Sequence, residues 1–219
     1  LPTKMNINIP RRLWHIWVGP IEPPRAWMNS WPEKHPDWEY KIFGNEDLAQ
    51  TTFHNQHLID EYFRRGKYNG VADLVRYELL LEYGGFVPPA DAVCFENTDE
   101  LWTKSPDVCY TVYENETIRP GYVSPIYACN PGNRFVQLIV DTLHQLQPHE
   151  LSDKVWQSTG NLFLAKLIEL TNPDICIFPS HFFIPKHFKA KTPRYDGPDK
   201  VYADQMWGTT RKIYHEGTA

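Results

Sequence analysis

The sequence predicts an α/β domain built on a mainly parallel sheet. Short runs of branched and aromatic residues alternate along the chain with longer segments of helical periodicity, and glycines or prolines separate them. The chain has 219 residues, enough for a single domain to bury a core without disulfides or metal. Since neither an internal repeat nor a linker interrupts this order, we interpret residues 1–219 as one domain.

The first predicted elements are two strands with a helix between them. Residues 12–18 (RLWHIWV) form an apolar run that stops at Gly19-Pro20, which is typical of a buried strand. Pro23-Pro24 precedes a predicted helix that runs to His35, with proline in its first turn. Residues 38–43 (WEYKIF) alternate between polar and apolar side chains and predict a second strand.

Three further helices are predicted before the middle of the chain. Asn45 is placed to cap a short helix over residues 46–50, and residues 57–65 predict a helix that ends at Gly66. Residues 71–83 predict a longer amphipathic helix that stops at Gly84-Gly85, because glycine accepts the left-handed backbone at a helix end. A short strand then leads into a loop that carries Asp91.

The second half continues the alternation. Strands are predicted over residues 108–113, 122–129 and 175–178, and helices over residues 134–146 and 161–170. Residues 114–121 predict a polar loop, and the tail from Pro193 is expected to wrap the surface.

Composition argues against several classes of function. The net charge is -5 and no basic stripe occurs, which disfavours a nucleic-acid partner. No apolar run approaches the roughly 20 residues of a spanning helix, so we expect no membrane span. The four cysteines are widely spaced in apolar stretches, which favours buried free thiols and a reducing compartment.

Two places at the ends of predicted strands carry the candidate chemistry, since open α/β sheets bind ligands beyond the carboxyl ends of their strands. Trp17-Val18-Gly19 ends the first strand, and a ring there could stack on a nucleobase. Pro89-Ala90-Asp91 follows the third strand. A carboxylate there could hold a divalent cation that bridges a diphosphate and neutralises a leaving nucleoside diphosphate.

Three ordered blocks carry a family resemblance: IPRRLWHIWVG, WPEKHPDWEYKIFGNEDL and GVADLVRYELLLEYGGFVPPADAV. Together they resemble the family 32 glycosyltransferases, relatives of the yeast initiating outer-chain mannosyltransferase and, more distantly, of the clostridial glucosylating toxins. The match covers roughly the first hundred residues and continues loosely beyond them. It implies a GT-A fold, a Rossmann-like sheet flanked by helices, with a donor-binding half over about residues 1–97 and an acceptor-side half over about residues 98–219.

The resemblance also implies roles for single residues. Trp17 would stack on the donor base, and Asp73 and Arg76, one helical turn apart, would contact the donor sugar and its diphosphate. Asp73, Arg76 and Asp91 are the catalytic candidates. A surface ion pair worth under about 1 kcal/mol is the other interpretation of Asp73 and Arg76. The remaining donor-side candidates are Val18, Gly19, Tyr77, Ala90 and Trp207, and the acceptor-side candidates are Glu114, Tyr122 and Thr159.

The chain departs from the family at its D-x-D element. Val87 replaces a tyrosine and Pro89 replaces the first aspartate, so only Asp91 remains. In such folds the second acid is usually the direct metal ligand, so Asp91 could still hold Mn²⁺ or Mg²⁺, with Asp204 as a further ligand. The alternative is that Asp91 is only a turn residue and the protein is metal-independent or inactive.

The resulting hypothesis is a glycosyltransferase that moves a hexose from a nucleoside diphosphate sugar to a glycan or protein hydroxyl. A UDP-sugar is the first candidate donor and GDP-mannose the second. We expect a cytoplasmic enzyme of bacterial or viral type, or a domain of a longer multidomain chain. One alternative is a non-catalytic carbohydrate- or nucleotide-binding module, which Pro89 favours. Another is a nucleotidyltransferase or sugar-nucleotide hydrolase on a related sheet.

Overall fold

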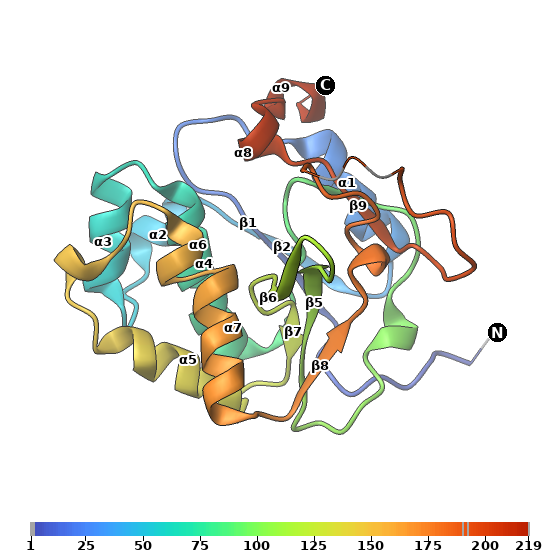
Figure 1. Cartoon of the computed structure of the whole chain (residues 1–219), viewed down its shortest axis with the longest axis horizontal. Coiled ribbons are helices and arrows are strands. Elements are labelled where there is room, and N and C mark those ends of the chain that lie inside the picture. The colour runs from blue at the N-terminus through green and yellow to red at the C-terminus, as the bar shows by residue number, and fades with distance from the viewer. Residues whose placement is uncertain (1–2, 190, 192, 219) are drawn as a thin grey trace.

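The strands of the computed structural model form a central sheet with helices on both faces (Figure 1). The structure describes residues 3–189, 191 and 193–218. Within these residues the strands are β1 (Arg12–Ile16), β2 (Glu39–Phe43), β3 (Gly85–Phe86), β4 (Ala92–Cys94), β5 (Cys109–Asn115), β6 (Arg119–Val123), β7 (Ala128–Cys129), β8 (Ile175–Phe178) and β9 (Ala203–Gln205). The helices are α1 (Arg25–Lys34), α2 (Asn45–Gln50), α3 (Gln56–Arg64), α4 (Tyr68–Tyr83), α5 (Arg134–His144), α6 (Val155–Ser158), α7 (Asn161–Thr171), α8 (Gly208–Arg211) and α9 (Tyr214–Gly217).

The central sheet is mixed but mostly parallel. Its order over the described residues is β2-β1-β3-β7-β5-β6, with β8 beside β5. Strand β1 pairs in parallel with β2 and β3, and β5 pairs in parallel with β8. Because β7 is antiparallel to both β3 and β5, the strands β2, β1, β3, β5 and β8 all run one way, and β7 and β6 run the other. The predicted α/β class is therefore confirmed.

Each face of the sheet covers a separate hydrophobic core, because successive side chains of a strand point to opposite faces. Trp14 of β1 belongs to the same buried cluster as Leu58, Leu74 and Ile139 from helices α3, α4 and α5. Its neighbour Leu13 packs in the other core, which includes residues of helix α1 and of the chain around residues 101–112. Figure 1 shows α3, α4, α5 and α7 gathered on one side and α1 on the other.

Two predicted helix starts need correction. Helix α4 begins at Tyr68, three residues before the predicted position, and ends at Tyr83, followed by Gly84 with a φ of 65° as the glycine stop predicts. The residue that caps α2 is Gly44, not Asn45. The Asn45 side chain bonds both backbone groups of Gly19, accepting at Oδ1 (2.8 Å) and donating through Nδ2 (2.9 Å). It thereby ties the loop after β1 to α2.

The predicted strand over residues 122–129 is two strands. Strand β6 ends at Val123 and β7 begins at Ala128, with Ser124-Pro125 between them. Proline has no N–H to give to a ladder, which ends the pairing there. The predicted loop over residues 114–121 is the end of a hairpin, in which β6 folds back on β5. This hairpin stands at the front of the molecule in Figure 1.

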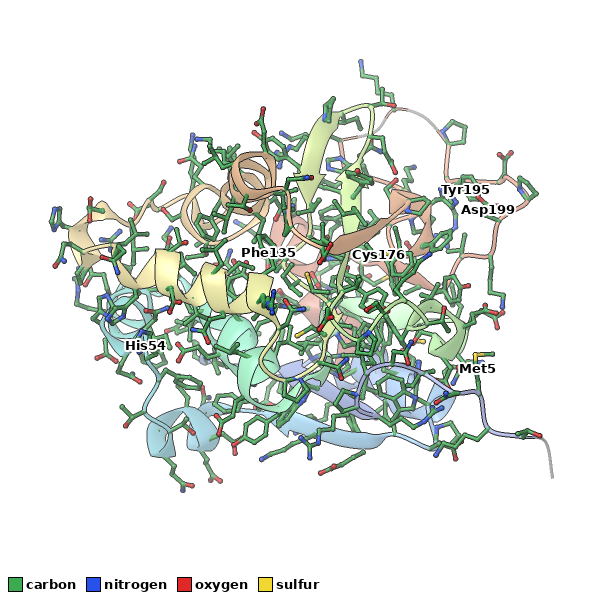
Figure 2. All side chains as sticks on the ribbon, turned by 90° about the horizontal axis from the view of Figure 1, so that it is seen from below. Met5, His54, Phe135, Cys176, Tyr195 and Asp199 are labelled. Carbon is green, nitrogen blue, oxygen red and sulfur yellow. The ribbon has the colours of Figure 1, made fainter. Side chains whose placement is uncertain are left out.

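The tail does more than wrap the surface. Tyr195 and Asp199 do lie on an outer loop, as Figure 2 shows, and the Asp199 N–H donates to the Tyr195 hydroxyl. Strand β9, however, pairs antiparallel with β4, with Val93 opposite Asp204. This pairing returns the end of the chain to the edge of the sheet where Asp91 lies.

The cysteines agree with the expectation from composition. All four cysteines are free, and Cys94, Cys109 and Cys129 are buried. In the described part of the chain, none of the helices has the length and apolarity that a membrane crossing requires.

Strand β3 lies so close to β1 that a side chain at Gly85 is expected to destabilise the fold. Its φ is 107°, and a Cβ there would overlap the carbonyl oxygen of Arg12. We expect Gly85→Ala to lower the free energy of unfolding by about 3 kcal/mol or more, from backbone strain plus the clash. Urea denaturation measures this change.

The matched control is Gly132→Ala. Gly132 also has a positive φ, 70°, but a Cβ there would meet no atom within 4 Å. Gly132→Ala should lower the free energy of unfolding by only about 1 kcal/mol, from backbone strain alone. Equal losses at the two glycines would contradict the assigned contact between β3 and β1.

Candidate functional site

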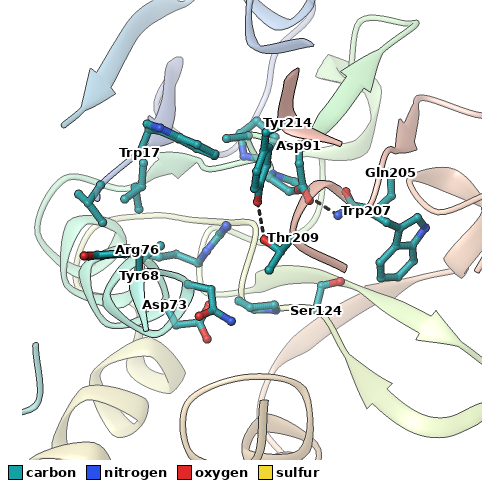
Figure 3. A pocket seen from close by; sticks show the side chains of 18 of the residues that line it. Trp17, Tyr68, Asp73, Arg76, Asp91, Ser124, Gln205, Trp207, Thr209 and Tyr214 are labelled. Atoms are coloured by element: carbon teal, nitrogen blue, oxygen red, sulfur yellow. Dashed lines mark hydrogen bonds between the residues drawn. The ribbon is translucent and has the colours of Figure 1, made fainter. Parts of the chain in front are cut away.

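A cavity of about 440 Å³ opens at the carboxyl ends of β1 and β3 (Figure 3). This is the edge at which open α/β sheets bind ligands. The structure brings together on its wall most of the residues that the sequence singles out: Trp17, Val18, Asp73, Arg76, Ala90, Asp91, Glu114 and Trp207.

The other predicted residues lie behind this wall or away from it. Tyr77 is fully buried and its hydroxyl donates to the Thr159 carbonyl oxygen over 2.5 Å, so both residues support the site from behind. Gly19 lies under the Tyr68 ring, where a Cβ would come within 2.7 Å of the ring. Asp204 is ion-paired with Arg194 and is not part of the cavity wall.

Arg76 is a buried cation that joins three parts of the site. Its Nη1 donates to the carbonyl oxygens of Val87 and of Ile126, the second over 3.1 Å. Its Nε has no hydrogen-bond partner among the described residues. Burial lowers the pKa of Arg76, and the nearby Asp73 carboxylate opposes this shift. Since only 9% of the residue is exposed, a solvated surface ion pair with Asp73 does not describe it.

Asp73 faces the same cavity from one turn earlier on α4. Burial raises its pKa from 3.8 to about 7, while Arg76 and the hydroxyl of Thr159 act in the opposite direction. The Thr159 hydroxyl donates to Asp73 Oδ2 over 3.0 Å. The carboxyl group is therefore poised between its two protonation states near neutral pH, as is common at functional sites.

Asp91 holds the end of the chain against the cavity. Its Oδ1 accepts from Gln205 Nε2 over 2.9 Å, and its Oδ2 accepts from the N–H of Gly208 over 3.0 Å. Figure 3 shows the Gln205 contact beside Trp207. Burial raises the pKa of Asp91, and these two hydrogen bonds counter the rise. Asp91 is thus more than a turn residue.

Trp17 shares its part of the cavity with Tyr214, a residue that the sequence did not single out. The two rings meet edge to face with centroids 4.9 Å apart, and the Tyr214 hydroxyl bonds Thr209. The Trp17 indole N–H donates to the Ile21 carbonyl oxygen over 2.7 Å, which fixes the ring plane. The tail therefore covers the surface on which a planar base would stack.

Glu114 belongs to a buried polar network, and its other members, Asn161 and His187, were not identified from the sequence. Glu114 is 3% exposed; its Oε1 lies 2.8 Å from His187 Nε2, and its Oε2 accepts from Asn161 Nδ2 over 2.7 Å. The Nδ1 of His187 accepts the N–H of Lys189 over 3.1 Å, so the hydrogen on Nε2 points to Glu114. Asn161 could have been found from the sequence, because it begins a helix directly after Gly160. No local sequence pattern indicates His187.

The residues around Asp91 fit a divalent cation only in part. Hard cations prefer oxygen ligands, and Asp91 offers its carboxylate beside Gln205, whose buried Oε1 has no hydrogen-bond partner in the part of the chain that the structure describes. Over the described ranges, however, no three His, Cys, Asp or Glu side chains are grouped to hold a metal ion. Asp91 and Gln205 could therefore supply only part of the ligand set of a Mn²⁺ or Mg²⁺ ion.

Sequence comparison links the chain to glycosyltransferases. No protein-family model matches it. Inositol phosphoceramide mannosyltransferase 2 of Schizosaccharomyces pombe is 26% identical over 141 residues, which are 63% of this chain and 39% of that protein. Inositol phosphoceramide mannosyltransferase 3 of the same yeast is 25% identical over 169 residues, 74% of this chain and 46% of that protein. The chain spans less than half the length of these curated relatives.

Structure comparison identifies the fold. The PaToxG glycosyltransferase superposes with a TM-score of 0.59 at 13% identity, over 74% of this chain and 69% of its own. The UDP-bound glycosyltransferase domain of the YGT toxin superposes with a TM-score of 0.56 at 10% identity, over 78% of this chain and 80% of its own. The fold is that of the GT-A glycosyltransferases. The fold expected from the three sequence blocks is therefore confirmed.

The raised pKa of Asp73 predicts a pH-dependent change of stability. The unfolded chain ionises this group above 3.8 and the folded chain only above about 7, so its contribution is present at low pH and lost as pH rises. We expect Asp73→Asn to raise the free energy of unfolding at pH 8 by about 1–2 kcal/mol. The full shift would give roughly 4 kcal/mol, and the partial exposure of Asp73 to solvent reduces it.

Urea denaturation at pH 8, 6 and 4 measures this gain, which should shrink as pH falls. Asp174→Asn is the control, because Asp174 is exposed and lies outside the cavity. It should change stability little at any pH. A gain from Asp73→Asn that is the same at pH 4 and pH 8 would contradict the assignment.

The hydrogen bonds of Asp91 predict its effect on the tail. Asp91→Ala removes the acceptors for Gln205 and Gly208 and should speed amide exchange over residues 206–212 about tenfold, or about 1.4 kcal/mol. Hydrogen–deuterium exchange of that peptide measures it. Asp204→Ala breaks the pair with Arg194 instead and should leave this peptide's exchange unchanged. Equal effects of the two variants would show that Asp91 does not anchor the tail.

Proposed function

We propose that the chain is a family 32-like glycosyltransferase that moves a hexose from a nucleoside diphosphate sugar to an acceptor hydroxyl. One observation carries the proposal. A single cavity at the carboxyl ends of β1 and β3 combines an indole, a buried guanidinium and two carboxyl groups. An indole suits a base, a guanidinium suits a diphosphate, and a carboxyl group can accept from sugar hydroxyls.

The comparisons support this proposal and suggest the donor. Both curated relatives are named mannosyltransferases, and one of the superposed glycosyltransferase domains is described as UDP-bound. A UDP-sugar is the first candidate donor and GDP-mannose the second. The acceptor is a glycan or a protein hydroxyl.

In the proposed reaction the bond between the anomeric carbon and the diphosphate oxygen breaks, and a bond to the acceptor oxygen forms. The acceptor proton passes to the leaving diphosphate. Arg76 lies on the cavity wall, so its guanidinium can donate to oxygens that gain negative charge as that bond breaks. Asp73 orients the sugar by accepting from its hydroxyls when it is ionised.

In the proposed reaction the tail also contributes to binding of the donor. Trp207, Thr209 and Tyr214 line the cavity opposite Asp73, so a bound donor would lie between α4 and the tail. Exclusion of water by such a cover strengthens the interactions of Arg76 with the diphosphate and limits hydrolysis. Asp91 and Gln205 would hold a Mn²⁺ or Mg²⁺ ion shared with the diphosphate. That ion would neutralise negative charge on the leaving group.

A non-catalytic binding module remains the second candidate, because Pro89 stands where the family carries an aspartate. It predicts donor binding without turnover. The two candidates therefore differ in one measurable quantity, the release of nucleoside diphosphate.

The test is incubation with a panel of UDP- and GDP-hexoses, with Mn²⁺, Mg²⁺ or EDTA, while nucleoside diphosphate release is measured. We expect release to be fastest with a UDP-hexose. Arg76→Lys should lower kcat/KM at least about 100-fold, or about 2.7 kcal/mol, because a single ammonium group cannot reproduce the planar fork that bonds the two carbonyl oxygens on one side and the donor on the other. Trp17→Ala should raise the donor KM about tenfold.

Tyr83→Ala is the matched control, because Tyr83 is 38% exposed and does not line the cavity. It should leave both constants unchanged. Binding of every donor without release would favour the binding module. Release that is insensitive to both Arg76→Lys and Trp17→Ala would place the active site elsewhere.

A further inference from the structure

An aromatic pair lies beside the cavity and has no part in the donor site described above. Tyr122 comes from β6 and Trp156 from α6, and their ring centroids are 6.3 Å apart with planes tilted by 37°. Both side chains are only half-buried. The guanidinium of Arg119 lies 5.8 Å from the Tyr122 ring centroid and 5.3 Å from that of Trp156. We call these three residues the aromatic platform.

The platform adjoins the part of the cavity where Asp73 lies. A Cβ on Gly160 would lie 3.1 Å from the Trp156 Cα and 3.3 Å from Asp73 Oδ2, so only a glycine separates the two residues. On the other side, Arg119 Nη1 lies 3.2 Å from Glu114 Oε1, and Glu114 lines the cavity. The platform is therefore next to the part of the cavity where the donor sugar is expected.

The arrangement costs free energy, which argues against an incidental surface contact. Glu114 is buried with Arg119, Asn161 and His187 around it, and burying a charge is unfavourable unless it is paired and hydrogen-bonded. The ion pair fixes the Arg119 side chain, of which 21% is exposed. Its remaining N–H groups are thus oriented in advance, next to two ring faces.

Rings and a fixed guanidinium together match the chemistry of a pyranose. The C–H groups on one side of a pyranose ring form an apolar face that packs on Trp and Tyr rings. The hydroxyls at its edge accept from an arginine fork. A peptide segment has no comparable flat apolar face beside a ring of hydroxyls.

We infer that the acceptor is a glycan whose terminal pyranose stacks on Trp156 and Tyr122 and bonds Arg119. This inference deepens the proposed function and rests on it for the direction of transfer. It selects a glycan over a protein hydroxyl as the acceptor, and it assigns to Trp156 and Arg119 a role in acceptor recognition.

The experiment has two arms. The first measures binding of methyl α- and β-hexopyranosides by saturation-transfer NMR, with no donor present. The second measures transfer to the pyranosides that bind, and to a panel of serine- and threonine-containing peptides, from the donor with the fastest turnover. The variants are Trp156→Ala, Trp156→Phe and, as a control, Phe95→Ala, since Phe95 is 40% exposed and does not line the cavity.

We expect the wild-type protein to bind at least one pyranoside and to prefer pyranosides to peptides as acceptors. Trp156→Ala keeps the backbone and Cβ beside Gly160, and it should raise the acceptor KM at least tenfold while the donor KM changes less than threefold. Trp156→Phe retains a stacking face and should stay within about threefold of wild type. Phe95→Ala should behave as wild type.

The outcomes distinguish failure of the glycan-acceptor inference from failure of the proposed glycosyltransferase function. Transfer to peptides alone, or an acceptor KM that Trp156→Ala leaves unchanged, would overturn the inference while the proposed function stands. An equal rise in donor and acceptor KM would also overturn it, because the variant would then disturb the whole cavity. If no donor turns over but Trp156→Ala abolishes pyranoside binding, the proposed function fails and the platform stands as a glycan site.

Discussion

The buried guanidinium of Arg76 is the interaction on which the rest of the site depends. One side chain on α4 bonds the carbonyl oxygen of Val87, just before the loop that carries Asp91, and that of Ile126, beside the bend between β6 and β7. A buried charge is tolerated only when such partners surround it. The helix, both loops and the cavity between them are therefore fixed by the same requirement.

Much of the donor half of the fold could be predicted from local sequence. The alternation of apolar runs and helical segments identifies β1, α1, β2 and α4, because each has a clear period and a proline or glycine at its boundary. The position of Trp17 and Asp91 at one cavity follows from the same pattern, since parallel strands end at one edge of a sheet, whereas Asp73 and Arg76 were expected there only from the family resemblance.

The remaining features depend on contacts between distant segments, which no local pattern encodes. The hydrogen bond between Glu114 and His187 joins residues 73 positions apart, and Tyr214 reaches Trp17 only because β9 pairs with β4. Asn45 shows the opposite error. Its side chain suits a helix cap by type, yet it bonds both backbone groups of Gly19 instead, and at the helix start the Asp47 side chain accepts from the Gly44 N–H.

The two sides of the cavity wall differ in backbone stiffness, and the two prolines before Asp91 make one side stiff. Pro88 and Pro89 have a fixed φ, so the carboxylate is presented by a stiff segment whose unfolded form has few conformations to lose. The opposite wall is a tail in which Trp207 and Lys212 adopt a positive φ that side chains rarely favour. The side of the wall that the sheet supplies is therefore stiff, whereas the tail stores backbone strain that a change of its conformation would release.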